Sequence, residues 1–471
     1  MTSDPQPRRL HPAAIVVGAV GAALRLVTSA VVVALVGSGG SSSTALTYGV
    51  AGIAISVLAA WLSWSRTTYW LDDVALHLRS GVFTPDERIV PRARVQAVDT
   101  GAGPLQRLFG VVELRVQTPG ASDEDEIVLT AVTHAEAARL RSELGQPEAE
   151  APDERVRLSM RDLLLAALTG PQLSAAVSAV AGAYALLNNV IDLRAGESLL
   201  TSLDTVQEIA IAVTVALVAA YLLSFAGAII AFAGFEVERD RQILRINRGL
   251  LSRRAQSIPL ARVDGIVVVE GLLRGPLGLA ALRIETAAYG GERAAARTLL
   301  PLVRRRDAEA VIARLVPALA VAPGALDRPP PRALRRFLLA PAFAGALAGT
   351  ALAVAVPAFW PAAPALVLAG ALAGLRAYRA AGVRLAGDIV VVREARLARR
   401  TLLARRHRLQ RHELARTPLQ ARGRLADLRV TVGSGGNGRA RHLEAATAEA
   451  AFAALRRGRG THWPPSAAAS R

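Results

Sequence analysis

Residues 89–117 read IVPRARVQAVDTGAGPLQRLFGVVELRVQ, and this stretch decides the fold because the chain carries it in three versions. The second version is IPLARVDGIVVVEGLLRGPLGLAALRIE at residues 258–285, and the third is RRHRLQRHELARTPLQARGRLADLRVT at residues 405–431. Near its start each version has an arginine followed by an apolar and a polar residue. A leucine-rich turn and an alternating strand come next, and an Ala-Glu-Ala helix start follows each version. The repeat is far longer than the roughly 20–50 residues of a solenoid unit, so it predicts duplicated domains.

The alternating strand indicates the kind of domain. Val112, Leu114 and Val116 fall on one face, and the residues between them are polar. This two-residue period is typical of a half-buried strand. Thr133, three residues before Glu136, predicts a capping box that begins an amphipathic helix. Several short strands followed by one helix predict an open antiparallel barrel or sandwich with a helix closing one end.

The composition indicates a membrane protein. All 56 basic residues are arginine, the formal net charge is +18, and 52% of the residues are hydrophobic. The charge alone suits either nucleic acid or an anionic membrane surface. A soluble nucleic-acid-binding protein would not have a mean hydropathy of +0.33, and 4% aromatic residues are too few for base stacking. We therefore expect a lipid bilayer, and no nucleic acid, as a partner. The absence of cysteine excludes disulfides and thiolate metal sites.

Long apolar runs come in pairs before each version of the repeat. Each run has about the 20 residues that a helix needs to cross a bilayer. The pattern predicts a multi-domain α+β membrane protein with about six transmembrane helices in three hairpins, each followed by an antiparallel barrel with a C-terminal helix. The expected segments are an N-terminal segment at 1–12, hairpins at 13–65, 163–235 and 337–380, modules at 69–144, 235–319 and 383–457, and a disordered tail at 458–471.

Arginine is distributed unevenly around these runs. Arginines from Arg8 to Arg384 flank the helix ends on one side, whereas the loops on the opposite side hold Arg194 alone. Cytoplasmic flanks carry the excess of basic residues, so we expect a multi-pass protein of the cytoplasmic membrane with both termini and all three modules in the cytoplasm. Arg25 interrupts the first run, which disfavours a signal peptide there. We interpret it as a snorkelling side chain or a sign that the helix starts later, rather than as a functional residue.

The motifs that could carry catalytic, metal or cofactor chemistry fail on context. Residues 433–438 read GSGGNG and match a dinucleotide-binding spacing, but they align with a hairpin tip and do not open a helix. His407 and His412 are five residues apart in a predicted strand, so they point to opposite faces. Residues 123–126 are acidic but lack the glycine and the distal glutamate of a calcium loop. We expect no enzymatic activity, no metal and no cofactor.

With these features assembled, the chain resembles bacterial pleckstrin-homology-like (PH-like) membrane proteins of the YdbT type over nearly its whole length. The residues that carry the resemblance are Leu10-His11-Pro12, Gly81, 89–96, 104–110, Gly249, 258–264 and Leu277-Gly278. The third module departs from the pattern, since Ala395, Arg405 and Arg424 replace Gly81, Pro91 and Gly110. The resemblance implies a seven-stranded barrel capped by a C-terminal helix, a cytoplasmic-membrane location, and a non-catalytic role in envelope stress or resistance to antimicrobial compounds.

Seven arginines are the candidate binding residues. The modules would present them at the inner membrane surface to anionic phospholipid headgroups, or to a protein partner of unknown identity. They are Arg94, Arg107, Arg262, Arg274, Arg405, Arg406 and Arg408. The leucine-rich turns at 104–109 and 272–277 could pack internally or receive a partner, and internal packing is the favoured interpretation.

The alternative function is a transporter or lipid-handling protein with a pathway through the helical hairpins. An intramembrane cavity lined by Arg25 would favour this alternative. A dry interface of alanine and glycine between the helices would favour the binding modules instead.

Overall fold

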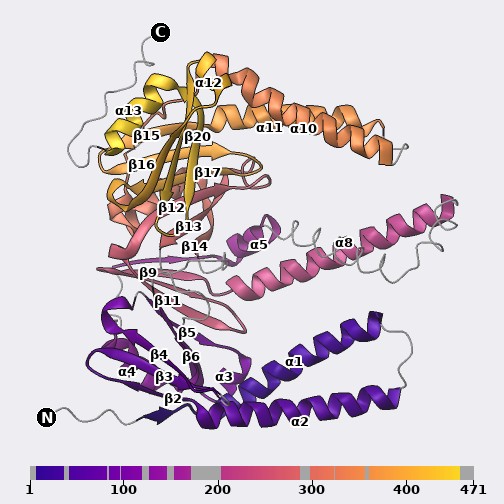
Figure 1. Ribbon diagram of the computed structural model, residues 1–471, viewed down its shortest axis with the longest axis vertical. Coiled ribbons are helices and arrows are strands. Elements are labelled where there is room, and N and C mark those ends of the chain that lie inside the picture. Colours follow the sequence, from indigo (N-terminus) through magenta and orange to yellow (C-terminus); the bar gives the residue numbers. More distant parts are fainter. Residues whose placement is uncertain are drawn as a thin grey trace. The chain divides into compact units, whose positions relative to one another are not determined.

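The computed structural model describes residues 7–36, 42–81, 84–95, 97–118, 127–145, 153–170, 203–286, 297–322, 324–355 and 360–456 of the chain (Figure 1). The chain divides into two compact units, Met1–Pro259 and Leu260–Arg471. The division falls inside the second repeat, between its first three long strands and its last three.

In unit 1, the first repeat packs two antiparallel sheets around one core. The first sheet has the order β1-β2-β3-β4, and its strands are β1 (Arg8–Arg9), β2 (Thr68–Leu71), β3 (Ala75–Ser80) and β4 (Asp86–Pro91). The second half of the repeat contains β5 (Ala97–Ala102), α3 (Pro104–Leu108), β6 (Val111–Gln117), β7 (Ile127–Thr133) and α4 (His134–Glu143). Leu114 and Val116 are fully buried, as the alternating pattern predicts, and they pack with Leu76 and Leu140 in the core.

Helix α4 begins at its predicted cap, where Thr133 Oγ1 accepts a hydrogen bond of 3.3 Å from the Glu136 backbone N–H. The other half of the predicted capping box is absent. The Glu136 carboxylate instead accepts from the guanidinium of Arg139 at 2.7 Å and from that of Arg8 at 2.8 Å. Charge-assisted bonds of this kind are stronger than a bond to a neutral backbone amide, and the Arg139 bond also lowers the pKa of Glu136.

The second sheet of unit 1 continues from the first repeat into the second. Its order is β7-β6-β5-β11-β10-β9-β8, and the added strands are β8 (Glu154–Arg157), β9 (Glu236–Asp240), β10 (Ile243–Arg248) and β11 (Arg253–Pro259). The two repeats join where β11 pairs antiparallel with β5, with Arg254 opposite Gly101.

Unit 2 contains the same kind of joint. The second repeat ends with β12 (Val263–Glu270), β13 (Leu279–Thr286), β14 (Thr298–Arg304) and α9 (Ala308–Leu315). The third repeat contains β15 (Gly382–Ala386), β16 (Ile389–Ala395), β17 (Arg399–Arg405), β18 (Leu409–Ala415), α12 (Pro418–Arg422), β19 (Leu425–Val432), β20 (Asn437–Glu444) and α13 (Ala445–Arg456). One sheet has the order β14-β13-β12-β17-β16-β15, and a second has the order β18-β19-β20. β17 pairs with β12 from Arg399 opposite Glu270 to Ala404 opposite Gly265.

The repeated antiparallel sheets agree with the expected class, but the modules are not separate barrels. In each unit, one strand of a repeat pairs with a strand of the repeat before it: β11 of the second repeat pairs with β5 of the first, and β17 of the third pairs with β12 of the second. An open sheet leaves unpaired N–H and C=O groups along its edge, and the neighbouring repeat satisfies them here. Comparing copies within the sequence shows what each repeat contains but not which strands pair between repeats.

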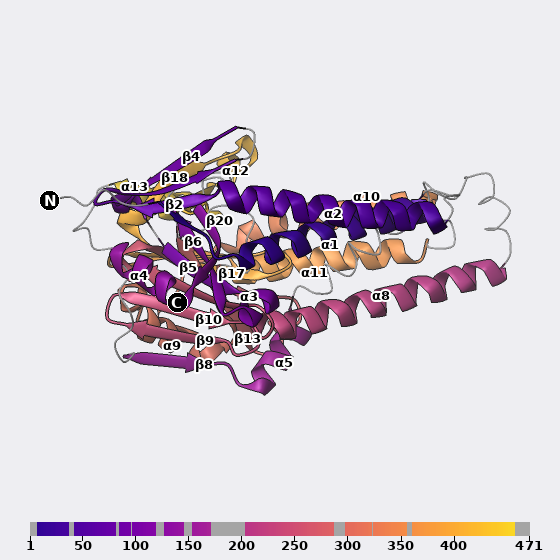
Figure 2. The ribbon, with the colours of Figure 1, turned by 90° about the horizontal axis from the view of Figure 1, so that it is seen from below.

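The described parts of the apolar runs form helices outside the sheets, and Figures 1 and 2 show α1 beside α2 and α10 beside α11. The helices are α1 (Ala13–Val36), α2 (Ser42–Arg66), α5 (Met160–Leu168), α8 (Leu203–Phe232), α10 (Leu334–Ala355) and α11 (Ala362–Ala380). Within the described ranges, one helical stretch, Pro331–Val354, is long and apolar enough to cross a membrane, and Ala13–Ala23 and Leu217–Phe232 are shorter apolar stretches. Residues 171–202 of the hairpin expected at 163–235, and the side chain of Arg25, lie outside the described residues.

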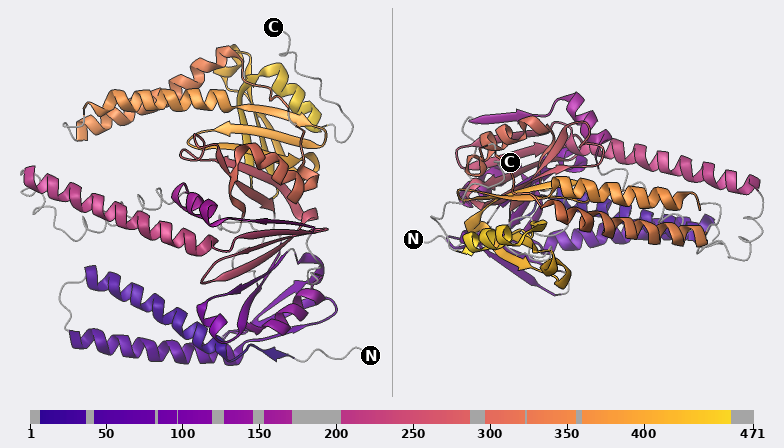
Figure 3. Two further views of the ribbon diagram at one scale, coloured as in Figure 1. Left: turned by 180° about the vertical axis from the view of Figure 1, so that it is seen from behind. Right: turned by 90° about the horizontal axis from the view of Figure 1, so that it is seen from above.

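Helices α10 and α11 lie side by side (Figure 3), and glycines line the seam between them. A Cβ added at Gly345, Gly370 or Gly374 would overlap backbone atoms of the opposite helix, and one added at Gly349 would lie 2.7 Å from Ala363 Cα. Small residues at such an interface allow two helix backbones to approach each other closely.

Candidate functional site

A groove in unit 1 lies along the joint between the first two repeats. Its volume is about 1340 Å³. The first repeat contributes residues of β5, α3 and α4, and the second contributes residues of β10, β11 and the turn between them. The groove also reaches Ala233 and Gly234, directly after the end of α8.

Arginine dominates the polar lining of this groove. Five arginines line it, and they are Arg107, Arg141, Arg248, Arg253 and Arg254. Glu236 is the one carboxylate among the lining residues, and it already pairs with the Arg155 guanidinium at 2.9 Å and that of Arg157 at 2.7 Å. The groove therefore presents a large excess of positive charge.

Backbone pairing and packing position each of these arginines. On α3, Arg107 Nη1 donates to the Leu250 carbonyl at 3.0 Å, and on α4, Arg141 Nη2 donates to Ser257 Oγ at 2.9 Å. The Arg248 guanidinium lies 5.9 Å from the centre of the Phe232 ring, which is a cation–π contact with the end of α8.

Arg253 and Arg254 occupy the joint itself. Both belong to the part of β11 that pairs with β5, and both side chains are exposed. They are therefore available to an anion that enters the groove, and their backbone is fixed by the sheet.

Leucines stand beside the arginines at the end of the groove near α8. Leu108 is 77% exposed, and Leu250 and Leu251 are 57% and 47% exposed. The β10–β11 turn is held to the end of α8 because the Leu250 N–H donates to the Ile230 carbonyl at 2.9 Å. Exposed apolar side chains next to guanidinium groups, beside the end of an apolar helix, make an amphipathic surface.

The expectation that the leucine-rich turns pack internally is wrong. Besides Leu108, the turn after β12 exposes Leu272, Leu273 and Leu277 by 54%, 50% and 61%.

Unit 2 has a second arginine-lined hollow, with a volume of about 730 Å³. It is formed by the β16–β17 hairpin and by β18, β19 and β20. Its arginines are Arg396, Arg400, Arg411, Arg429 and Arg439. Glu394 and Glu413 also line it, and Glu413 Oε2 lies 3.3 Å from Arg429 Nη1. Its charge is thus more nearly balanced than that of the groove in unit 1.

Of the seven sequence-predicted arginines, Arg107 alone lines the groove. Arg94 is exposed at the end of a short 3-10 helix, Arg92–Arg94. Arg262 is half-buried, and burial lowers its pKa. Arg274 is 9% exposed, and burial, with the nearby Arg283 charge, lowers its pKa to about 10.

The three remaining arginines bind backbone carbonyls within unit 2. Arg405 Nη2 donates to Val263 O at 3.2 Å, and Arg408 donates to Ala261 O. Arg406 Nη2 donates to Ala454 O at 2.6 Å, which ties it to α13. These bonds hold unit 2 together, and they direct all three guanidinium groups toward protein atoms.

Sequence reasoning missed Arg141, Arg248, Arg253 and Arg254, because they lie outside the repeated stretch. A signal for two of them was present. Residues 249–254 read GLLSRR and residues 395–400 read ARLARR, so a hairpin with leucine followed by paired arginines occurs in the second and third repeats.

The GSGGNG stretch lies at a hairpin, as the sequence predicts, whereas His407 lies in the 3-10 helix Arg406–Arg408 and not in the strand expected for it. Residues 433–436 join β19 to β20 in a hairpin, and Gly435 has a φ of +82°, which favours glycine. A Cβ at Gly436 would lie 2.7 Å from the Glu285 carboxyl carbon, so glycine also permits a close approach there. Within the described ranges no group of His, Asp and Glu side chains could hold a metal ion. Residues 123–126 lie outside those ranges.

Comparison with known proteins gives a consistent result. The family model for the bacterial PH domain matches three segments of the chain, at residues 13–148, 173–318 and 336–459. The chain is 25% identical over 468 residues to "UPF0699 transmembrane protein YdbT" of Bacillus subtilis (strain 168), an alignment that covers 91% of this chain and 93% of the relative. No solved structure matches the chain.

Proposed function

Because the chain belongs to the bacterial PH domain family, we propose that it is a membrane protein whose tandem domains bind anionic phospholipid headgroups. The domains act as a binding scaffold without catalytic activity. The relative named as a transmembrane protein and the apolar helices of this chain support the membrane location. A role in envelope stress or resistance to antimicrobial compounds, which the family resemblance implies, fits a protein that senses or organises lipid at the membrane surface.

The groove of unit 1 carries this proposal. A lipid phosphate offers several acceptor oxygens, and guanidinium groups bind such oxygens with two parallel N–H donors. The exposed leucines at the groove suit the apolar side of the headgroup layer, whereas the arginines suit its phosphates. A free phosphate in water would bind the arginines but would make no apolar contact with Leu108, Leu250 and Leu251.

The magnitude is sufficient for selective binding. Each arginine near an anionic surface contributes on the order of 1 kcal/mol, and salt screens that contribution. Arg253 and Arg254 are the most accessible pair, so together they should contribute about 2 kcal/mol, which corresponds to about 30-fold in affinity.

The binding test uses purified full-length protein in a neutral detergent. Isothermal titration compares dioctanoyl phosphatidylglycerol with dioctanoyl phosphatidylcholine, which differ in net charge but not in chain length. We expect tighter binding of the anionic lipid, weakened by salt, and a loss of about 30-fold in the Arg253→Gln/Arg254→Gln variant.

The matched control removes the same charge elsewhere. Arg306 is 74% exposed and Arg456 is exposed at the end of α13, and neither lines the groove. The Arg306→Gln/Arg456→Gln variant should bind the anionic lipid as the parent does. Equal binding of the two lipids, or equal losses in the two double variants, would refute the proposal.

We further propose about six transmembrane helices in three hairpins, with all three domains in the cytoplasm. The uneven placement of arginine around the apolar runs supports this orientation. The chain has no cysteine, so single thiols can report on it. In intact cells, an impermeant maleimide should label Ala362→Cys. It should not label Ser142→Cys, Ala310→Cys or Ala450→Cys, whose positions are exposed on α4, α9 and α13, the last helix of each domain. Labelling of one domain thiol from outside would reject this topology.

The transporter alternative lacks a supporting observation. The glycine seam leaves no room for a pathway between α10 and α11. The side chain of Arg25, the residue that could have lined a cavity, lies outside the described residues.

A further inference from the structure

Eight of the described strands lie at sheet edges, and two of them, β4 and β18, differ from their counterparts in the other repeats. Among the described strands, β4 pairs with β3 alone and β18 pairs with β19 alone. Their counterparts in the other repeats are paired on both sides: β11 and β17 correspond to β4, and β5 and β12 correspond to β18. The first repeat therefore has one half of a joint, and the third repeat has the other half.

We propose that β18 of one copy of this chain pairs antiparallel with β4 of a second copy, so that the sheet continues from chain to chain. The partner is a second copy because the two edges are the two halves of a contact that the chain already makes twice. Addition of a strand to a sheet edge is a common mode of recognition, since main-chain hydrogen bonds supply the affinity. The contact is head to tail, so it generates a ring or a filament rather than a two-fold dimer.

The internal joints fix the register of this pairing. Both joints use equivalent positions, since Arg254 lies opposite Gly101 in one and Arg400 lies opposite Val269 in the other. Equivalent positions are identified from the 3-10 turn that directly follows β4, β11 and β17. These turns are Arg92–Arg94, Leu260–Arg262 and Arg406–Arg408.

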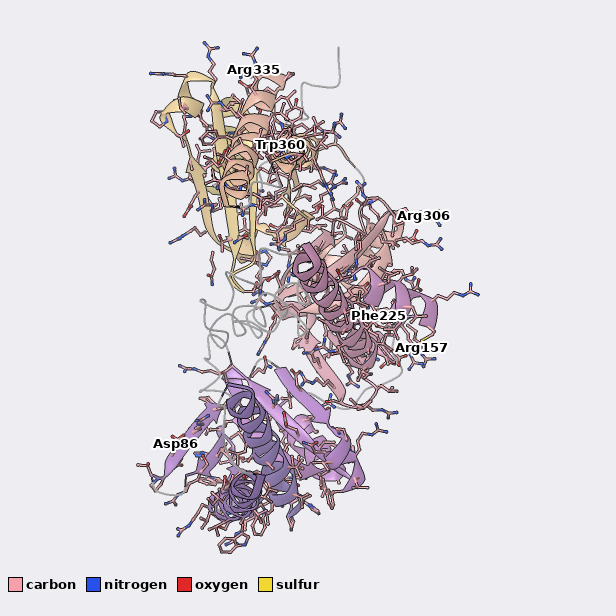
Figure 4. All side chains as sticks on the ribbon, turned by 90° about the vertical axis from the view of Figure 1, so that its right-hand side faces the viewer. Asp86, Arg157, Phe225, Arg306, Arg335 and Trp360 are labelled. Carbon is pink, nitrogen blue, oxygen red and sulfur yellow. The ribbon has the colours of Figure 1, made fainter. Side chains whose placement is uncertain are left out.

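Carried over to β4 and β18, the same register places Asp86 opposite Ala415. It also places Arg88 opposite Glu413, and Ile89 opposite His412. Figure 4 labels Asp86 at the periphery of the first sheet, where β4 forms the edge.

The side chains at these positions are complementary. The internal joint of unit 2 places Leu402 opposite Val267. The corresponding residues of β4 and β18 are Arg88 and Glu413, which carry opposite charges. Opposite charges across a strand pair are stabilising.

Burial supports the same contact. Ile89 is 55% exposed on β4, although its counterparts in the joints, Ser257 and Leu403, are 1% and 6% exposed. A strand paired against β4 would cover Ile89 as the joints cover those two residues.

The test uses the cysteine-free background and two chains with different affinity tags. One chain carries Ile89→Cys and the other carries His412→Cys. Directly opposed residues have Cα atoms about 4.5–5.5 Å apart, which is within the range of a disulfide. Mild oxidation in membranes should therefore give a linked pair that contains both tags.

Two controls test register and charge. Arg88→Cys points to the opposite face from Ile89, so with His412→Cys it should give little product. Arg88→Glu should lower the yield of the Ile89–His412 product about two- to fivefold, and Glu413→Arg in the partner should restore it.

Absence of the mixed product, equal product from Arg88→Cys, or a disulfide formed within one chain carrying both cysteines would overturn the proposal.

Discussion

Replacement of Glu270 by glutamine should loosen the joint between the second and third repeats. Glu270 ends β12, and its register partner across the joint is Arg399 of β17. The carboxylate is buried, with its side chain 4% exposed, and it lies 3.4 Å from Arg399 Nη1 and 3.6 Å from Arg305 Nε. Glu270→Gln keeps the shape of the side chain and removes the charge that faces both guanidinium groups.

The magnitude lies between two limits. Breaking a fully buried ion pair costs about 3–5 kcal/mol, and an exposed pair contributes about 0.2–1 kcal/mol. Glu270 is buried, but the side chains of Arg399 and Arg305 are 25% and 48% exposed, so water screens the freed charges. We therefore expect a loss of about 2 kcal/mol, which corresponds to about 30-fold in the opening equilibrium of the joint.

Hydrogen–deuterium exchange of the full-length protein measures this opening directly. Amides of β12 and β17 should exchange about 30-fold faster in Glu270→Gln, because local opening exposes the hydrogen bonds of the joint. Glu449→Gln is the matched control: Glu449 is 54% exposed and pairs with Arg416 at 2.7 Å, so its loss should change exchange by about fivefold or less. Unchanged exchange across β12 and β17 in Glu270→Gln would refute the description of the joint.

Two further predictions concern the third module and the helix seam. Burial lowers the pKa of His442 below its ordinary value of 6.5. As the pH falls below 6.5, the unfolded chain therefore binds a proton at this histidine before the folded chain does. The free energy of unfolding then decreases, by at most about 1.4 kcal/mol per pH unit. Hydrogen exchange of the β19–β20 amides, corrected for the intrinsic effect of pH on exchange, should become faster as this stability is lost. His442→Asn should abolish the pH dependence, because asparagine tolerates the positive φ of 52° at this position. Gly370→Ala should lower the thermal stability of the purified protein by about 1–3 kcal/mol, because the added Cβ overlaps the Pro341 backbone. Gly227→Ala on α8 should be neutral or stabilising, because among the described residues no atom outside its own helix backbone lies within 4 Å of the added Cβ.

Sequence reasoning could predict features that one repeat encodes by itself. The alternating pattern placed Leu114 and Val116 in the core, and the alignment of the copies placed residues 433–436 in a hairpin. Both follow from local periodicity and turn chemistry, so they need no knowledge of neighbouring strands.

The joints and the groove could not be predicted in this way, because they depend on pairing between repeats. Arg405 and Arg408 looked like a basic surface in the sequence, but the joint turns them onto the carbonyls of Val263 and Ala261. Sequence reasoning missed Arg253 and Arg254, which the pairing of β11 with β5 places in a groove beside α8. Local sequence contains the residue types, and the order of the strands decides which of them face solvent.

Photo-crosslinking in membranes tests the central claim most directly. Full-length protein would be reconstituted with phosphatidylglycerol bearing a photoreactive headgroup, and the crosslinked peptides identified by mass spectrometry. Crosslinks should concentrate on the α3 region at 104–108 and on the β10–β11 hairpin at 247–255, and should be lost in Arg253→Gln/Arg254→Gln. Crosslinks confined to the long helices, or retained in that variant, would contradict the assignment of the groove as a lipid-headgroup site.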